Sequence, residues 1–448
     1  FDGKWNSSSH ATGFIVDTQR GIILTNRHVV TPGPITAKAV LINNEEISLT
    51  PLYIDPVHDF GFYQYDPAAI KHITPHEFTL NAQSAHVGQD IRIIGNDAGQ
   101  KISILDGTIS RLDRDAPNYG KWTYNDFNTY YIQAATASTG GSSGSPVINV
   151  KGEVVALNAG SQSRSANAFY LPLTMIEQAL TALQNNQSIA RGTLQTTFVT
   201  TPYAELKRLG LTDALETSYR TLDKDLKGLL VINKIIPSSP AAEQLAIGDI
   251  LLAINDTPIV NFIELENTLN QNINNTISLT FLRSTKEYQV NVTVSDLTQI
   301  TPQAFLTFDE SIFHNLSYQQ ARHFNQPVDG VFVAMADASF KQAGIPNHSV
   351  IKEFNGVAIS TIKELHQQLN TIASGEKVHV RYFNQHDPNI LNYALVEINR
   401  KWFEHSYCEK DETLGYWPCE FFKQGEHVKK TPQPQVNTEF LNNKKAVH

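Results

Sequence analysis

Three short segments carry residues that could do chemistry together. The first, Ile22–Val30, begins as an apolar strand pattern and delivers His28 near its end. The second places Asp59 at the start of an apolar run, and the third places Ser143 in the glycine-rich turn Gly140–Pro146. A histidine, a carboxylate and a serine are the groups that nucleophilic attack on an acyl carbon requires.

These residue types depend on one another. A serine hydroxyl is a weak nucleophile at neutral pH, so it needs a base within hydrogen-bond reach and a third group that fixes the tautomer of that base. Backbone N–H groups must face the oxyanion, which favours glycines around the serine. Because the chain order histidine, aspartate, serine is one known order for such a triad, we interpret His28, Asp59 and Ser143 as its members.

Each residue alone also has an ordinary structural explanation. A single histidine among fifteen is more often structural, and a Gly/Ser run is commonly a flexible loop. A phosphate-binding loop is excluded because no Lys-Ser or Lys-Thr follows the glycines. Ser142 and Ser145 are the alternatives to Ser143 within the same turn.

Short strands must position these residues. Residues 11 to about 175 alternate between apolar runs and turn signals without long helical periodicity, which predicts an all-β barrel or sandwich. A helix is expected at 172–185, where large aliphatic residues recur every three to four positions.

Two later segments resemble each other and are interpreted as an internal repeat. Each contains two apolar strands separated by a turn, at 228–255 and at 330–356. A helical stretch follows in each, at 262–269 and 362–369, and then an alternating strand. This order predicts two small α+β modules.

The patterns divide the chain into four parts, and its length of 448 residues suits about three folded domains. We expect a strand-rich domain at 1–188, α+β modules at 189–297 and 298–400, and a C-terminal extension at 401–448. The Lys-, Pro- and Asn-rich end of that extension is typical of disorder.

The composition is that of an ordinary globular protein. It is 41% hydrophobic and 18% charged with a net charge of -9 and no long basic stripe, so nucleic acid is not an expected partner. No run of about 18 apolar residues occurs, so no membrane span is expected. The absence of a leader before Phe1 suggests a mature or trimmed product. We expect no metal and no other cofactor.

The two cysteines, Cys408 and Cys419, lie near the C-terminus, so a thiol nucleophile in the strand-rich domain is excluded. Their spacing suits no paired metal motif and favours a disulfide. Two buried free thiols, or a zinc site with His405 and His427, are the alternatives. A disulfide would indicate an oxidising compartment, with a periplasmic or secreted protein.

Longer runs strengthen a resemblance that the three segments already show. The segments resemble the histidine, aspartate and serine motifs of the HtrA (Deg) family of serine proteases. Four runs resemble the fungal nuclear branch of that family, of whose duplicated chain this sequence matches about one half: Asp55–Phe62, Gly95–Gly99, Ile109–Arg114 and Tyr124–Thr129. This resemblance gives a nuclear location as the alternative to a periplasmic one.

The resemblance implies a fold and further site residues. It implies an all-β, chymotrypsin-like double β-barrel followed by two α+β PDZ-like domains. The family's serine stands third in Gly-Asn-Ser-Gly-Gly-Pro, which falls on Ser143 and makes Ser142 and Ser145 departures from the pattern. The oxyanion hole would fall on the backbone N–H groups of Gly141, Ser142 and Ser143. Trimers occur in the family, which leaves a homo-oligomer open.

In this fold the primary specificity pocket lies between the segment before the nucleophile and the strand beyond it. The resemblance implies Ala135–Ser138 as one wall, with Ala137 and Ser138 in the pocket. The other wall would be Ala156–Gly160, with Leu157 and Asn158 in the pocket. Neither wall is acidic, so a basic P1 side chain would be buried without a partner. We expect cleavage after small or medium aliphatic residues.

The expected function is a serine endopeptidase that cleaves unfolded or misfolded proteins through an acyl-enzyme. PDZ domains bind extended peptide ends by strand addition, and the first groove would lie between about 194–200 and the helix near 262–271. A PDZ fold that acts only as a structural brace is the alternative for the modules. A non-catalytic peptide-binding scaffold or chaperone with a protease fold is the alternative for the chain.

Overall fold

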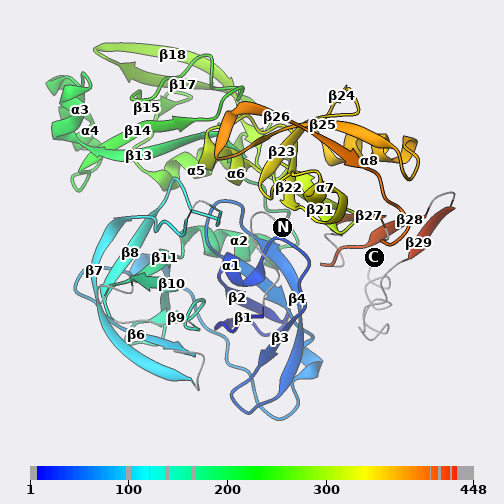
Figure 1. Cartoon of the computed structure of the whole chain (residues 1–448). Coiled ribbons are helices and arrows are strands. Elements are labelled where there is room, and N and C mark those ends of the chain that lie inside the picture. Colours follow the sequence, from blue (N-terminus) through cyan, green and yellow to red (C-terminus); the bar gives the residue numbers. More distant parts are fainter. Residues whose placement is uncertain are drawn as a thin grey trace. The chain divides into compact units, whose positions relative to one another are not determined.

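The computed structural model describes residues 8–96, 102–120, 122–136, 141–162, 167–403, 405–411, 415–423 and 426–430. The chain forms two compact units (Figure 1). The first comprises Phe1–Pro302 and Leu316–Asp329, and the second comprises Gln303–Asn315 and Gly330–His448. Within the described ranges, no helix combines the length and the apolar character needed to cross a membrane.

The protease-like region is the strand-rich domain expected at 1–188. Its N-terminal half is a five-stranded antiparallel sheet. Across the sheet the strands are β1 (Phe14–Asp17), β2 (Ile22–Thr25), β5 (Gly61–Gln64), β4 (Glu46–Ile54) and β3 (Ala37–Val40). The β1–β2 hairpin turns at Gly21, which has a φ of +66°, and an added Cβ there would lie 2.1 Å from the Tyr65 carbonyl oxygen. Helix α1 (Arg27–Val30) directly follows β2, so this hairpin determines where His28 lies.

The second half is a closed barrel with the strand order β10-β11-β8-β7-β6-β9 (Figure 1). Buried aliphatic side chains such as Ile93, Ile109 and Val147 fill its core. Helix α2 then begins at Thr174 and confirms the helix expected at 172–185. The bounds are η1 (Pro67–Ala69), η2 (Ala82–Ser84), β6 (Asp90–Gly95), β7 (Ser103–Asp115), β8 (Tyr130–Ala135), β9 (Pro146–Ile148), β10 (Val154–Gln162), β11 (Asn167–Pro172) and α2 (Thr174–Gln184).

The first α+β module completes the first unit. Its sheet has the order β13-β14-β15-β17-β18, so β13 is an edge strand, and helix α5 packs into the module core through Phe262, Leu265 and Leu269. Asn261 caps α5 by accepting the Glu264 N–H at 2.9 Å. The bounds are β12 (Gly192–Thr193), β13 (Thr196–Pro202), α3 (Tyr203–Arg208), α4 (Asp213–Leu222), β14 (Gly228–Ile235), β15 (Ile250–Ile254), β16 (Thr257–Pro258), α5 (Phe262–Gln271), β17 (Thr276–Arg283), β18 (Lys286–Thr293), β19 (Ser295–Asp296) and α6 (Tyr318–Phe324).

A buried ionic network attaches this module to the protease-like region. Arg191 donates to Asp55 Oδ2 from Nε at 2.8 Å and from Nη2 at 2.5 Å, and both side chains are nearly inaccessible to solvent. On α5, Glu266 is 2% exposed and accepts a hydrogen bond from Asn128 Nδ2 at 3.3 Å. Burial raises the pKa of Glu266 to about 7, against the partial opposing effects of Arg191 and Asn128.

This raised pKa predicts a pH-dependent stability. Because the pKa of Glu266 is about 7 in the folded protein and 4.5 ordinarily, the folded state holds the proton more tightly. The contribution of Glu266 to the free energy of unfolding should therefore fall, by about 3 kcal/mol, as the pH rises between these values. Glu266→Gln should melt at a higher temperature than the wild type at pH 8, with a smaller difference at pH 5. Equal differences at the two pH values would contradict this account.

The second unit contains the second α+β module and the start of the extension. Its sheet has the order β26-β25-β23-β22-β21-β20-β27-β28-β29, with β24 paired to β23. The module repeats the first: β22, β23, α8 and β25 follow one another as β14, β15, α5 and β17 do. The bounds are β20 (Ala304–Phe308), β21 (Ser311–Asn315), β22 (Val331–Met335), α7 (Ala338–Gln342), β23 (Ser349–Phe354), β24 (Val357–Ala358), α8 (Ile362–Thr371), β25 (Lys377–Asn384), β26 (Asp387–Glu397), β27 (His405–Glu409), β28 (Cys419–Lys423) and β29 (Glu426–Lys430).

The extension adds strands to this sheet. Cys408 and Cys419 face each other on β27 and β28 and form a disulfide, so the expected pairing is confirmed. His405, which the alternative zinc site would have used, contacts His366 of α8, with His405 Nε2 3.1 Å from His366 Nδ1. Among the described residues no cluster of histidine, cysteine and acidic side chains could hold a metal ion.

Candidate active site

The structure brings His28 and Asp59 into direct contact. His28 Nδ1 lies 2.8 Å from Asp59 Oδ2 and 3.0 Å from Oδ1, and the His28 backbone N–H donates to Oδ1 at 3.0 Å. Asn26 Nδ2 also donates to the Asp59 carbonyl oxygen at 2.9 Å. A proton on Nδ1 is therefore held by the carboxylate, which leaves Nε2 as the basic nitrogen of the ring.

The environment keeps Asp59 ionised. Its side chain is buried, and burial alone would raise the pKa of the carboxyl. The neighbouring His28, through its charge and its hydrogen bonds, outweighs burial and places the pKa of Asp59 below its usual value. A carboxylate in this position stabilises an imidazolium at His28.

The three serines of the glycine-rich turn have different surroundings. Ser142 is 1% exposed and Ser145 is 0% exposed, whereas Ser143 is partly exposed. Ser143 lines the same cleft as His28 and Asp59. The turn therefore presents Ser143, and neither of its serine neighbours, to the space beside the histidine.

Two residues outside the turn hold it in place. Thr12 donates its backbone N–H to the Ser143 carbonyl oxygen and its hydroxyl to that of Gly141, both at 2.9 Å. Asn158 Nδ2 donates to the Ser142 carbonyl oxygen at 2.7 Å. Gly141 has a φ of 101°, which favours glycine. Within the described parts of the chain, the N–H groups of Gly141 and Ser143 have no acceptor.

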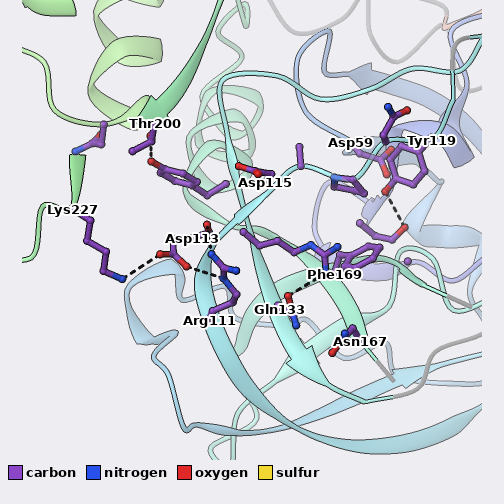
Figure 2. A pocket seen from close by; sticks show the side chains of 18 of the residues that line it. Asp59, Arg111, Asp113, Asp115, Tyr119, Gln133, Asn167, Phe169, Thr200 and Lys227 are labelled. Carbon is purple, nitrogen blue, oxygen red and sulfur yellow. Dashed lines mark hydrogen bonds and ion pairs between the residues drawn. The ribbon is translucent and has the colours of Figure 1, made fainter. Parts of the chain in front are cut away.

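A cleft of about 1370 Å³ is lined in part by His28, Asp59 and Ser143 (Figure 2). One part is walled by the protease-like region, including Tyr119, and another by Thr200 and Gly228 of the first module. Figure 2 shows Lys227 joined to Asp113, at 3.2 Å, on the module side of the cleft. The volume of the cleft exceeds the roughly 300–1,000 Å³ of typical small-molecule pockets.

The specificity wall predicted on β10 lines the cleft only in part. Leu157 and Asn158 are completely buried, Leu157 in the core and Asn158 against the serine turn. Ala159 and Gly160, which belong to the same predicted wall, line the cleft together with Asn167 and Phe169 of β11. The pairing of β10 with β11 shifts register between Asn158 and Gly160, which changes the side chains that face the cleft. Ala137 and Ser138 lie outside the described residues.

The expected groove of the first module contains side chains of the protease-like region. Asn128 Oδ1 accepts the backbone N–H of Phe198 on β13 at 2.8 Å, and its Nδ2 donates to Glu266 on α5. The Tyr130 hydroxyl contacts that of Thr200, and its ring lies 4.8 Å from the Phe262 ring. Asn128 and Tyr130 therefore bridge β13 and α5, where a peptide ligand was expected.

Sequence reasoning missed Asp126, which lies directly behind Asp59. Its carboxyl accepts the Asp59 backbone N–H at 2.9 Å. The residue belongs to the run Tyr124–Thr129, which was noticed only for its resemblance to a family. An acidic residue inside an aromatic-rich run was the available signal, because a buried carboxyl needs specific partners.

Comparisons with known proteins agree with this architecture. Residues 11–157 match the family described as "Trypsin-like peptidase domain", residues 213–294 match "PDZ domain", and residues 299–374 match "PDZ-like domain". The solved structure "HtrA-type protease AlgWS227A with tripeptide" shares the fold with a TM-score of 0.50 at 20% identity, covering 65% of this chain and 90% of that one.

Curated relatives are similar over most of the chain. "Protease Do-like 7" of Arabidopsis thaliana is 44% identical over 93% of this chain, and "Pro-apoptotic serine protease NMA111" of Kluyveromyces lactis is 44% identical over 94% of it. The chain spans 39% and 43% of the length of these two relatives. The chain therefore contains a trypsin-like peptidase domain followed by two PDZ domains, and over most of its length it is similar to Do-like and NMA111 proteases.

Proposed function

We propose that the chain is a serine endopeptidase in which Ser143 is the nucleophile, His28 the general base and Asp59 the carboxylate that orients it. The observation that carries this proposal is the exposure of a single serine of the turn to the cleft that holds the His28–Asp59 pair. The names of the two relatives, one a protease and the other a serine protease, support the same reaction.

The geometry supports a two-step acyl transfer. His28 Nε2 takes the hydroxyl proton as Ser143 Oγ attacks the scissile carbonyl carbon. The tetrahedral intermediate expels the amine, which receives that proton from His28, and an acyl ester remains on Ser143. Water, deprotonated by His28, then hydrolyses the ester and restores the hydroxyl. Asp59 holds the ring through Nδ1 in both steps.

Backbone donors of the turn would stabilise the oxyanion. We assign this role to the N–H groups of Gly141, Ser142 and Ser143, as the resemblance implies. Glycine at position 141 is required by its φ of 101°, and the anchors from Thr12 and Asn158 fix the carbonyl groups of the same turn. Fixed donors of this kind act without reorganisation during the reaction.

The substrates we propose are unfolded or partly folded proteins. A peptide must lie extended in the cleft to reach Ser143, and folded proteins seldom expose such a segment. Casein should be cut into fragments, and a serine-directed fluorophosphonate should block the cutting. A chain that binds casein without cutting it would instead be the peptide-binding scaffold that is the alternative function.

We base the expected P1 preference on the part of the cleft that β10 and β11 line. Ala159, Gly160 and Phe169 carry no charge, and Asn167 is neutral. We expect cleavage after valine, alanine or leucine. Each methylene gained or lost should change the binding energy of the transition state by only about 1–3 kcal/mol, so the preference should be graded. Sequencing the cut sites in a denatured protein checks this expectation. A majority of cuts after lysine or arginine would place the pocket elsewhere.

For the first PDZ domain we propose a bracing role. Asn128 uses the Phe198 N–H that a strand-adding peptide would need, and Tyr130 packs on Phe262 of α5. A peptide could enter only by displacing both side chains. This arrangement favours a brace over an open peptide-binding groove.

A further inference from the structure

A second buried carboxyl lies behind the proposed triad. Asp126 Oδ2 accepts the backbone N–H of Asp59 at 2.9 Å and the Tyr131 hydroxyl at 2.8 Å. Asp126 is 7% exposed, Asp59 2% and Tyr131 0%. Within the described part of the chain, Asp126 Oδ1 is buried and has no hydrogen-bond partner. The triad carboxylate is thus held from behind by a side chain that the mechanism above does not use.

The surroundings favour a neutral Asp126. Burial raises the pKa of Asp126 well above its ordinary value, and the negative charge of Asp59 raises it further. Its hydrogen bonds from Tyr131 and from Asp59, and the positive charge of Arg27, oppose this rise only in part. Two carboxyls this close cannot both ionise cheaply, and Asp59, paired with His28, is the one that stays charged.

Packing fixes the segment on both sides of Asp126. Arg322 of α6 donates to the Asn125 carbonyl oxygen and lies over the Phe127 ring at 4.3 Å. Phe127 also packs edge-on against Tyr318 of α6, with ring centres 5.7 Å apart. The backbone around Asp126 is therefore immobilised, so its carboxyl can impose a position on Asp59.

We propose that Asp126 is a positioning residue for the reaction. As a neutral carboxyl it fixes the backbone of Asp59 and thereby the direction in which the Asp59 carboxylate meets His28. This inference rests on the proposed function, since it matters for catalysis only if His28 and Asp59 activate Ser143. Asp126 itself lies behind Asp59 and is not among the residues that line the cleft.

Three variants separate this role from a merely structural one. In Asp126→Asn the amide oxygen can accept the same two hydrogen bonds, so most of the activity should remain. In Asp126→Ala the Asp59 N–H loses its acceptor, and kcat should fall about 10- to 100-fold with little change in KM. Tyr131→Phe is the matched control, because it removes the other hydrogen bond to Asp126 and leaves the bond to Asp59; its kcat should stay within about threefold of wild type.

Kinetics on a peptide substrate and a pH profile decide the outcome. The acid limbs of wild type and Asp126→Asn should coincide, because Asp126 is already neutral there. Equal kcat losses in Asp126→Ala and Tyr131→Phe would overturn the positioning role. An Asp126→Asn variant as impaired as Asp126→Ala, or one with a displaced acid limb, would overturn the neutral carboxyl.

A spectroscopic readout keeps the test independent of turnover. The proton between His28 Nδ1 and Asp59 should give a far-downfield proton NMR signal in the wild type and in Asp126→Asn. That signal should broaden or vanish in Asp126→Ala. An unchanged signal in folded Asp126→Ala would refute the positioning role, whether or not the wild-type chain cleaves peptides. If the wild-type chain cleaves nothing and Asp126→Ala still loses the signal, only the proposed function is refuted.

Discussion

Replacing Ser143 with alanine is expected to lower kcat/KM for casein or a peptide by roughly four to six orders of magnitude. Of the turn's three serines, Ser143 is the one that lines the cleft, so alanine there removes the hydroxyl that would form the acyl ester. The fold should be unaffected, because a partly exposed side chain loses a single oxygen. Fragment production measured by gel and by peptide hydrolysis checks the result.

Ser142 and Ser145 provide the matched controls. Ser142→Ala and Ser145→Ala each remove a hydroxyl from a completely or almost completely buried side chain in the same turn. Both should retain measurable activity, with losses that reflect local packing rather than the loss of a nucleophile. An inactive Ser145→Ala protein beside an active Ser143→Ala protein would move the nucleophile to position 145.

Of the variants considered, those that break the Asp55–Arg191 pair should lower the free energy of unfolding most. Asp55→Ala would leave the Arg191 guanidinium buried without its carboxylate, which costs about 3–5 kcal/mol. It would also remove the acceptor of the Val57 and His58 N–H groups, at 2.9 and 2.7 Å, in the turn that leads to Asp59. Urea unfolding of the full chain measures the loss.

The double variant Asp55→Ala/Arg191→Met is the control for this charge effect. It removes both charges, so it should be more stable than Asp55→Ala alone. Burial would raise the pKa of Asp55, but Arg191 holds it well below its usual range. Asp55 therefore contributes stability above the ordinary aspartate pKa and loses it as the pH falls. Equal stability of Asp55→Ala and the wild type would show that the pair is not a structural anchor.

The chemistry-bearing residue types could be predicted because they stand in short, distinctive segments. His28 closes a strand pattern and Asp59 opens another, so their order indicated a triad. The sequence could not by itself choose among Ser142, Ser143 and Ser145, since all three share one glycine-rich turn. Their different burial arises from contacts with Thr12 and Asn158, which are remote in the chain.

The parts of the fold and of the site that the sequence could not predict depend on strand register and on long-range packing. The sequence could not say which residues of the wall predicted on β10 face the cleft, because the register shift between Asn158 and Gly160 is a property of the pairing with β11. The repeat predicted both α+β modules, whereas β20 and the extension strands that enlarge the second sheet carry no repeat signal. The importance of Asp126 arises only when its segment packs behind Asp59.

Labelling of the full chain with a fluorophosphonate distinguishes an activated Ser143 from an ordinary serine hydroxyl. The reagent reacts with a serine only when a base has activated it, and peptide mass spectrometry identifies the modified residue. We expect one adduct, on Ser143, that is lost in His28→Ala. An adduct on Ser142 or Ser145, or a folded wild-type chain that forms no adduct at Ser143, would contradict this expectation.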